Sequence, residues 1–229
     1  MKRSLLIGAG VAVGILTIYR LTASPTISWV DSGVIAAAAK TLGIANPPGF
    51  PAYMLIGHMF TKIPWGSVVS RLQLLSQLSA LGIAAFTYWM VTRQASRRSG
   101  LFAAVAIAFS YGLWQQANNV ETYTLTNFVL FLLLGWTITI NTTNITNTTN
   151  KPILPIKILG LGFIAGLAMG LNPTISALVP AAVYWMVTRR NAVVKNIRIF
   201  APAALFFVIG VIIIYSYLPI RAAAHPFVN

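Results

Sequence analysis

Long apolar runs alternate with short polar stretches along this chain. Five runs are nearly continuous, at residues 4–22, 72–92, 101–140, 158–187 and 199–220. A helix needs roughly 20 apolar residues to cross a hydrocarbon core about 30 Å thick. The run at 101–140 is twice as long as one crossing and has a polar patch at its centre, so it predicts a helical hairpin. The run at 158–187 predicts two shorter spans that turn at Asn172-Pro173. The pattern therefore predicts an all-α polytopic membrane protein with seven transmembrane helices in one module, residues 1–229.

Residues 23–70 break this pattern and predict a long first loop. Residues 34–42 are rich in alanine, which favours a helix, and residues 52–63 are apolar but too short to span a membrane. We expect two short helices that lie at the membrane surface. Between them stands Asn46-Pro47-Pro48-Gly49-Phe50-Pro51. Pro47, Pro48 and Pro51 fix their φ angles and Gly49 permits a turn, so these four residues predict a rigid structural bend.

The composition supports a membrane protein. Hydrophobic residues make up 57% of the chain and charged residues only 8%, whereas an average soluble domain has about 25% charged residues. So few charges cannot cover the surface of a soluble globular protein. Disorder is also excluded, because it requires low hydrophobicity.

The basic residues indicate the orientation of the chain. There are 16 Lys and Arg against two acids, and they lie between apolar spans instead of forming a single run. This spacing favours contact with anionic membrane lipids and the positive-inside rule, with no nucleic-acid partner. Inner segments carry eleven basic residues, namely Lys2, Arg3, Arg93, Arg97, Arg98, Lys151, Lys157, Arg189, Arg190, Lys195 and Arg198. Outer segments carry five, namely Arg20, Lys40, Lys62, Arg71 and Arg221. We therefore expect a cytoplasmic N-terminus and an outer C-terminus.

This orientation leads to an interpretation of two further segments, the polar loop after residue 140 and the first apolar run. The low-complexity stretch NTTNITNTTN at residues 141–150 opens a loop, residues 141–157, that we place in the cytoplasm as a solvated linker. Residues 4–22 are interpreted as an uncleaved signal anchor. A cleaved signal peptide is the alternative, but Arg20 lies just before Ala23, the small-residue candidate for cleavage.

Both carboxylates of the chain, Asp31 and Glu121, fall at the outer face in this topology. An ionisable residue at a membrane boundary is a candidate for function. The alternative is structural, since Asp31 suits the N-cap of the helix that follows it and Glu121 suits the N-terminus of a helix that begins at Tyr123. The chain has no cysteine and two histidines, so we expect neither thiol catalysis nor a metal site.

An ordered series of short motifs carries a family resemblance. The series is Asp31-Ser-Gly33, Leu42 to Pro51, Arg71-x-x-Leu-Leu, Gln116-x-x-x-x-Glu121-x-Tyr123 and Tyr217-Leu-Pro-Ile-Arg221-Ala-Ala. It resembles a bacterial family of polytopic proteins, formerly of unknown function, that is related to protein O-mannosyltransferases. That family belongs to the GT-C superfamily of membrane glycosyltransferases. The resemblance extends from about residue 28 to residue 229.

The resemblance implies a fold, a reaction and a set of site residues. The fold is a helix bundle with a long first outer loop that carries an acidic residue. The reaction transfers a sugar from a polyprenyl-phosphate donor to a hydroxyl of an acceptor protein or glycan on the non-cytoplasmic side, without a certain cofactor. The implied location is a bacterial inner (plasma) membrane. Asp31 matches the catalytic aspartate, and the expected substrate-binding residues are Glu121, Tyr123, Asn46, Arg71 and Arg221. The two arginines are expected near the leaving phosphate, because transfer needs cationic groups there.

Three positions depart from the family pattern. Val34 replaces a usual Glu, while Asn46 and Pro173 each replace a usual His. A catalytically inactive accessory subunit is therefore one alternative function, and a transporter or lipid-handling protein is another. Family members are much longer, so we expect this chain to be the N-terminal part of a longer protein.

Overall fold

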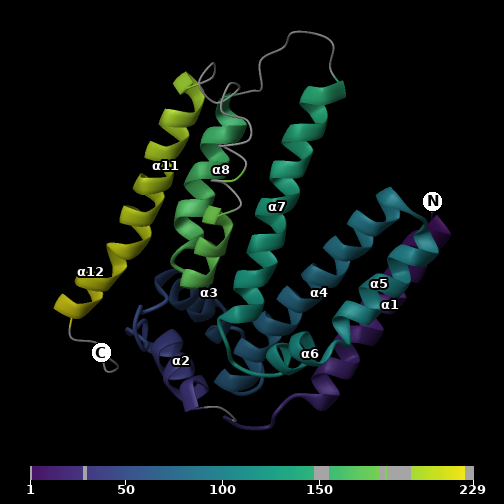
Figure 1. Ribbon diagram of the computed structural model, residues 1–229. Helices are drawn as coiled ribbons and strands as arrows, with labels where there is room; N and C mark the ends of the chain where they lie inside the picture. The colour runs from purple at the N-terminus through teal and green to yellow at the C-terminus, as the bar shows by residue number, and fades with distance from the viewer. Residues whose placement is uncertain (1, 28–29, 147–154, 181–183, 185–196, 225–229) are drawn as a thin grey trace.

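The computed structural model describes residues 2–27, 30–146, 155–180, 184 and 197–224, and within them it is all-helical, without a strand (Figure 1). This confirms the predicted all-α class. The helices are α1 (Lys2–Thr22), α2 (Val30–Thr41), α3 (Pro51–Thr61), α4 (Val68–Gln94), α5 (Arg97–Ala108), α6 (Tyr111–Ala117), α7 (Tyr123–Thr146), α8 (Pro155–Ala168), the 3₁₀ helix η1 (Pro173–Ala177), α11 (Ile197–Tyr215) and α12 (Tyr217–Ala223).

Two helical stretches are long and apolar enough to cross a membrane. They are α4, over Val68–Gln94, and the stretch Phe200–Ala223 that α11 and α12 form together. Shorter apolar helices cover Gly8–Thr22, Tyr123–Thr137 and Lys157–Ala168. These helices support a membrane protein, while the number of seven spans and their orientation stay predictions. Residues 147–154 of the predicted cytoplasmic loop, and residues 181–183 and 185–187 of the predicted span after Asn172, lie outside the described residues.

The hairpin predicted at residues 101–140 differs from the expectation in its first arm. That arm is α5, with 12 residues, followed after Phe109 and Ser110 by α6, with seven. At 1.5 Å per residue, α5 extends only about 18 Å, which is less than the hydrocarbon thickness. The first arm is therefore broken into two short helices where we predicted one uninterrupted span.

Two hydrophobic clusters hold the bundle, and α4 contributes to both. The smaller cluster joins α1, α4, α5 and α6 through Ile15 and Tyr19, packed against buried alanines such as Ala80 and Ala108. The larger cluster surrounds Tyr53 and joins α2, α3, α4, α7, α8 and α11. Because α4 connects the two clusters, it fixes α1 and α6 relative to the short helices α2 and α3.

Helices α8 and α11 pack backbone against backbone. A Cβ atom at Gly166 would collide with the carbonyl oxygen of Phe207, and one at Gly162 would collide with that of Ala203. Gly210 of α11 faces the carbonyl oxygen of Phe163 in the same way. Small residues at a spacing of four allow this close approach. The repeat of Gly162, Gly166 and Gly170 therefore serves helix packing.

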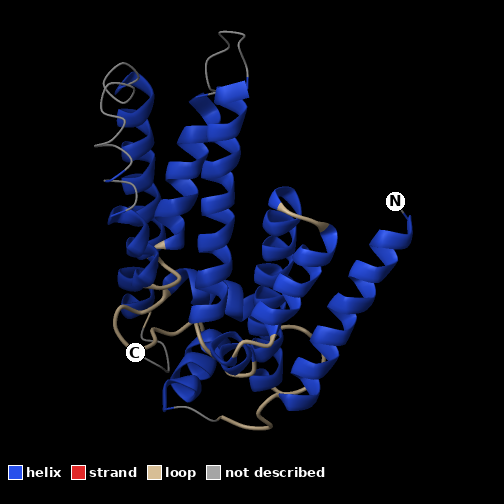
Figure 2. Cartoon of the chain, turned by 45° about the vertical axis from the view of Figure 1, so that its right-hand side comes forward, coloured by secondary structure: helices blue, strands red, loops and turns tan. Residues whose placement is uncertain are grey.

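The short helices α2, α3 and α6 gather toward one end of the bundle (Figures 1 and 2). Helices α2 and α3 are the two short helices predicted in the first loop, and their bounds differ from the predicted ones by a few residues. His58 of α3 lies 2.9 Å, through Nδ1, from the carbonyl oxygen of Ala39 in α2 and so links the pair. We call this end of the bundle the acidic end, because both carboxylates lie there.

Candidate active site

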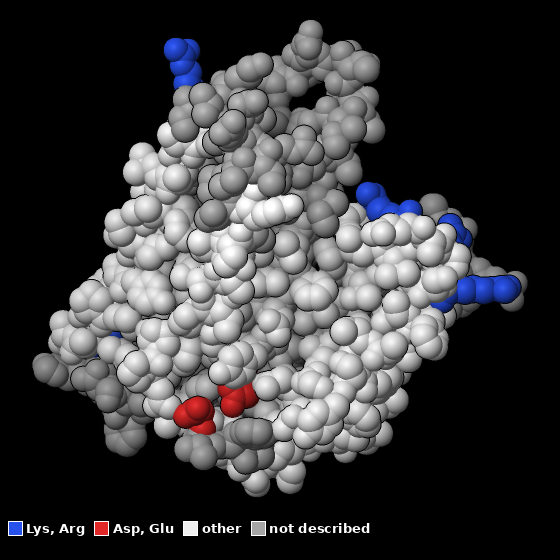
Figure 3. All heavy atoms as spheres, in the orientation of Figure 1, with Lys and Arg blue, Asp and Glu red and all other residues white. Residues whose placement is uncertain are grey.

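The two carboxylates lie next to each other although they are far apart in the sequence. Asp31 is in the first turn of α2, and Glu121 is in the connection between α6 and α7. Figure 3 shows the two side chains side by side at the acidic end. The pKa of Glu121 is raised, first by partial burial and second by the negative charge of Asp31, while a hydrogen bond from the Thr122 backbone opposes the shift. The charge of Asp31 therefore acts on Glu121, and we call these two residues the acid pair.

Asp31 is bound by Asn46, the first residue of the segment 46–51, which we call the proline bend. Asn46 donates a hydrogen bond from Nδ2 to Oδ1 of Asp31 at 2.6 Å, so the bend and α2 are joined at the carboxylate. The helix begins at Val30, before Asp31. Asp31 is therefore not the N-cap, and that interpretation of the sequence is wrong. Within the first turn its negative charge is still favourable at the positive end of the helix dipole.

The proline bend is a tight turn with left-handed backbone at its end. Gly49 donates its N–H to the carbonyl oxygen of Asn46 at 2.9 Å, and the φ angles of Gly49 and Phe50 are 89° and 45°. A Cβ at Gly49 would lie 2.7 Å from Cδ2 of Leu218. Glycine is required there for both its φ angle and its size. Pro51 then begins α3, at the position in a helix where a missing N–H costs nothing.

Helix α12 holds the far side of this bend. Arg221 donates from Nε to the carbonyl oxygen of Leu42 at 2.5 Å and from Nη2 to that of Thr41 at 3.2 Å. Tyr217 donates from its hydroxyl to the carbonyl oxygen of Gly43 at 2.8 Å. These carbonyls end α2, and cations suit a helix C-terminus. The structure thus places Arg221 as a clamp on α2, and its predicted contact with substrate stays a prediction.

Arg71 is a second backbone clamp. Its guanidinium donates to the carbonyl oxygens of Thr61 at 2.5 Å, Trp65 at 2.6 Å and Gly66 at 2.9 Å. All three acceptors belong to the end of α3 and the connection to α4. Three of the five N–H donors of the guanidinium are therefore engaged. The geometry fixes the start of α4, and the predicted phosphate contact of Arg71 stays a prediction.

The start of α7 completes the neighbourhood of Glu121. Tyr123 is exposed, whereas Thr122 is buried and accepts a hydrogen bond from Nδ2 of Asn172 at 3.0 Å. Asn172 in turn accepts from the backbone N–H of Thr174 at 3.0 Å and so caps η1, which begins at Pro173. The Asn172-Pro173 turn is therefore joined to the same end of α7 as Glu121.

Three buried hydroxyls near the pair were not identified from the sequence. Ser32, Tyr53 and Thr124 are at most 1% exposed, and the structure gives their side-chain oxygens no hydrogen-bond partner within its described part. The pKa of Tyr53 is raised by burial and by the charge of Glu121, so its phenol keeps its proton. Buried hydroxyls normally find a partner. Their only sequence signal is proximity, because Ser32 follows Asp31 and Tyr53 follows the bend.

The donor set near the pair limits what it can hold. Within the described residues, no group of three or more His, Cys, Asp and Glu comes together. The polar groups at hand include the two carboxylates, the amide of Asn46 and the three buried hydroxyls. Such an arrangement can accept a proton and hydrogen-bond to hydroxyls, which is the chemistry of general base catalysis.

Comparison with known proteins adds a family. Residues 31–195 match the family model described as "Protein O-mannosyl-transferase TMEM260 N-terminal domain". Mouse protein O-mannosyl-transferase TMEM260 is 29% identical over 181 residues, which are 78% of this chain and 25% of the mouse protein. The Dictyostelium discoideum protein of the same name is 26% identical over 121 residues, 51% of this chain and 15% of that protein. The chain thus spans about a quarter of the mouse relative. No solved structure matches it.

Proposed function

Because the chain belongs to the family of the protein O-mannosyl-transferase TMEM260 N-terminal domain, we propose that it is the membrane part of a glycosyltransferase. The substrate class is a mannose-type sugar on a polyprenyl-phosphate carrier, and the acceptor is a hydroxyl of a protein. The observation that carries the proposal is the acid pair of Asp31 and Glu121, held between the proline bend and the start of α7. Partners are thus membrane lipids, the lipid-linked donor and the acceptor protein.

Asp31 is the general base of the proposed reaction. Its carboxylate takes the proton of the acceptor hydroxyl while that oxygen forms a bond to the anomeric carbon of the sugar. The bond between this carbon and the carrier phosphate breaks, and the phosphate leaves with the electron pair. Asn46 holds Oδ1 of Asp31, so the carboxylate is oriented before the acceptor arrives. Such positioning is what general base catalysis requires.

The remaining predicted residues take supporting roles. Glu121 and the exposed Tyr123 stand beside the base, where they would bind hydroxyls of the sugar. For the leaving phosphate we propose Arg221, because its backbone bonds engage two N–H groups and a guanidinium has five. Arg71 uses three of its N–H groups on the carbonyl oxygens of Thr61, Trp65 and Gly66, which leaves fewer N–H groups for a phosphate.

The site faces the outside of the membrane in this proposal. Helix α4 has 27 residues and is about 40 Å long. It begins near the acidic end and carries Arg93 in its last turn. The positive-inside rule then puts Arg93 in the cytoplasm and the carboxylates on the opposite face. A lipid-linked donor would reach the site from that outer leaflet.

The direct test is mannose transfer from a polyprenyl-phosphate mannose donor by the full-length protein in membranes. Asp31→Asn should lower the rate by about 10²–10⁴-fold, the usual contribution of a general base. Lys40→Gln, an exposed change at the other end of α2, is the control and should keep the wild-type rate. Equal rates for Asp31→Asn and wild type would make Asp31 structural. A wild-type protein without transfer would favour the inactive accessory subunit.

A further inference from the structure

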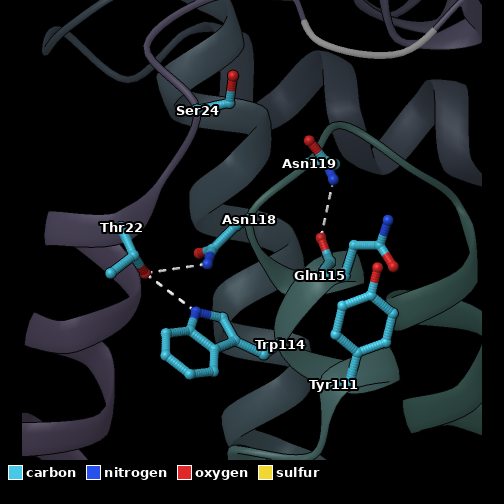
Figure 4. Close-up of a pocket in the computed structure, with 7 residues that line it drawn as sticks. All are labelled: Thr22, Ser24, Tyr111, Trp114, Gln115, Asn118 and Asn119. Atoms are coloured by element: carbon cyan, nitrogen blue, oxygen red, sulfur yellow. Dashed lines mark hydrogen bonds between the residues drawn. The ribbon is translucent and has the colours of Figure 1, made fainter.

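A pocket elsewhere in the described structure is lined by aromatic and uncharged polar side chains. Its volume is about 410 Å³, and it lies between the end of α1 and helix α6 (Figure 4). Thr22 and Ser24 line it from α1 and the residues that follow, and Tyr111, Trp114 and Gln115 line it from α6. Its volume is within the range of roughly 300–1,000 Å³ that is typical of sites for small ligands.

Hydrogen bonds hold one wall of the pocket in place. Thr22 accepts at Oγ1 from Nε1 of Trp114 and from Nδ2 of Asn118, each at 3.0 Å (Figure 4). With the Asn118 amide turned over, its oxygen instead accepts from Thr22 at 3.0 Å and from Trp114 at 2.7 Å. Either orientation ties α6 to the end of α1. The Trp114 ring also packs edge to face on Phe109, with 5.6 Å between ring centroids.

Two buried glutamines anchor this wall to α4. Gln73, 2% exposed, donates to the carbonyl oxygens of Ser24 at 2.8 Å and Asn118 at 3.0 Å. Gln77, fully buried, donates to the carbonyl oxygen of Tyr19 at 3.3 Å. A buried amide is costly unless it is hydrogen-bonded, so these bonds fix the backbone on both sides of the pocket. The pocket is therefore preorganised instead of being shaped by its ligand.

The lining groups are those that recognise a neutral sugar ring. Figure 4 shows the Trp114 indole on one side, with Tyr111 and Gln115 next to each other on the other side. An aromatic ring packs against the C–H face of a pyranose, while amides and a phenol hydroxyl bind its hydroxyls. Every described lining residue is uncharged, so the lining has no cation to neutralise a phosphate and suits a neutral ligand better. Aromatic side chains also contribute large apolar area with a polar group at one end.

We propose that this pocket binds a neutral hexopyranose ring and so forms a sugar subsite beside the acid pair. The proposal rests on the proposed transferase function. The pocket and the pair share the α6–α7 connection, because Asn119 lines the pocket and Glu121 belongs to the pair. Two residues span at most about 7 Å. A ring in the pocket is thus held close to the reacting groups.

The test is a titration of the full-length protein in nanodiscs with methyl α-D-mannopyranoside, in which binding is measured by saturation-transfer NMR. Wild type should bind saturably, and Tyr111→Ala and Gln115→Ala should each weaken binding at least tenfold. Tyr111 is 81% exposed, so its replacement should leave the fold intact. Gln94→Ala, an exposed glutamine at the end of α4, is the matched control and should bind as wild type does.

Competition identifies the source of the ring. Displacement of the glycoside by polyprenyl-phosphate mannose assigns the pocket to the donor sugar, and displacement by an O-mannosylated peptide assigns it to a glycosylated acceptor. Unchanged binding in Tyr111→Ala and Gln115→Ala would overturn the proposal. Displacement by a sugar-free polyprenol alone would also overturn it and make the pocket a lipid groove.

A further variant separates this proposal from the transferase function. Asp31→Asn should bind the glycoside with wild-type affinity, because Asp31 is not part of the pocket. Transfer without glycoside binding would sink the subsite and leave the function standing. Glycoside binding by a wild-type protein that shows no transfer would support the subsite and contradict the proposed transferase function.

Discussion

The acidic end and the α8–α11 pair are built on opposite principles. The pair is held by glycines that let two backbones touch, and its contacts are apolar. The acidic end holds both carboxylates, three buried hydroxyls without a partner in the described structure, and a turn with left-handed backbone. Tight packing tolerates little change, whereas polar groups left open can bind a substrate.

The difference shows how the bundle supports its site. Gly170, in the turn two residues after the end of α8, accepts a hydrogen bond at its carbonyl oxygen from the backbone N–H of Ala52 at 2.9 Å. The rigid pair thereby fixes the start of α3 and with it the proline bend that reaches Asp31 through Asn46. Functional groups need such rigid support to stay in position. Changes in the pair should therefore affect folding, and changes at the acidic end should affect transfer.

The largest effect is expected from Gly166→Val in α8. The valine side chain would meet the carbonyl oxygen of Phe207. Overpacking of this kind lowers the free energy of unfolding by about 1–3 kcal/mol, and occasionally by more. The yield of monodisperse protein and its thermal midpoint should both fall. Gly14→Val is the control, since a Cβ at Gly14 meets nothing within 4 Å. Equal stability of the two variants would mean that α8 and α11 are not packed as described.

Gly49→Val should separate activity from assembly. A non-glycine residue in the left-handed region costs about 1–3 kcal/mol, and Leu218 leaves no room for the new side chain. We expect transfer to be lost while membrane insertion stays intact, measured by the transfer assay and by alkaline extraction of membranes. Gly10→Val, in open space on α1, should change neither. Undiminished transfer in Gly49→Val would reduce the bend to a simple connector.

Arg221→Gln should have a moderate effect on stability. It weakens the hydrogen bonds to the last carbonyls of α2, which are worth about 1 kcal/mol net. A small drop in the thermal midpoint is expected, together with slower transfer. Arg98→Gln, an exposed change at the start of α5, is the control. If Arg221 binds only the phosphate, the midpoint should stay and the KM for the donor should rise.

The smallest effect concerns pH. The pKa of Glu121 is raised in the folded protein above its ordinary value of 4.5. The protonated Glu121 carboxyl therefore contributes its full share of folding stability below about pH 4.5, and this contribution is lost as pH rises through the pKa of the folded protein. Glu121→Gln should raise the thermal midpoint relative to wild type at pH 7 and not at pH 4. The corresponding difference in the free energy of unfolding between the variant and wild type should stay below about 1 kcal/mol, because water screens a half-exposed group. A larger gap at pH 4 than at pH 7 would reverse the sign of the coupling.

Local patterns in the sequence predicted much of this fold. The alanine-rich segment before the prolines and the apolar segment after them became α2 and α3. The start of α2 was missed by a few residues, so Asp31 was assigned a cap that it does not form. The break at Phe109 and Ser110 was also missed, because no proline or glycine marks it.

The roles of the arginines and the sugar pocket required three-dimensional contacts. Arg221 lies 179 positions from Leu42, whose carbonyl it binds, and no local pattern predicts such a bond. Trp114 fits an interfacial aromatic equally well by sequence, and its bond to Thr22 joins residues 92 positions apart. The meeting of Asp31 and Glu121 could be expected only because the predicted topology put both on one face.

The central claim is that the two carboxylates act as one site, and a double-mutant cycle on transfer tests it most directly. Rates would be measured for wild type, Asp31→Asn, Glu121→Gln and the double variant in the full-length protein. Residues that act as a unit are strongly non-additive, so the double variant should be no slower than the slower single variant. A double variant whose loss equals the product of the two single losses, or single variants that both keep the wild-type rate, would contradict the account.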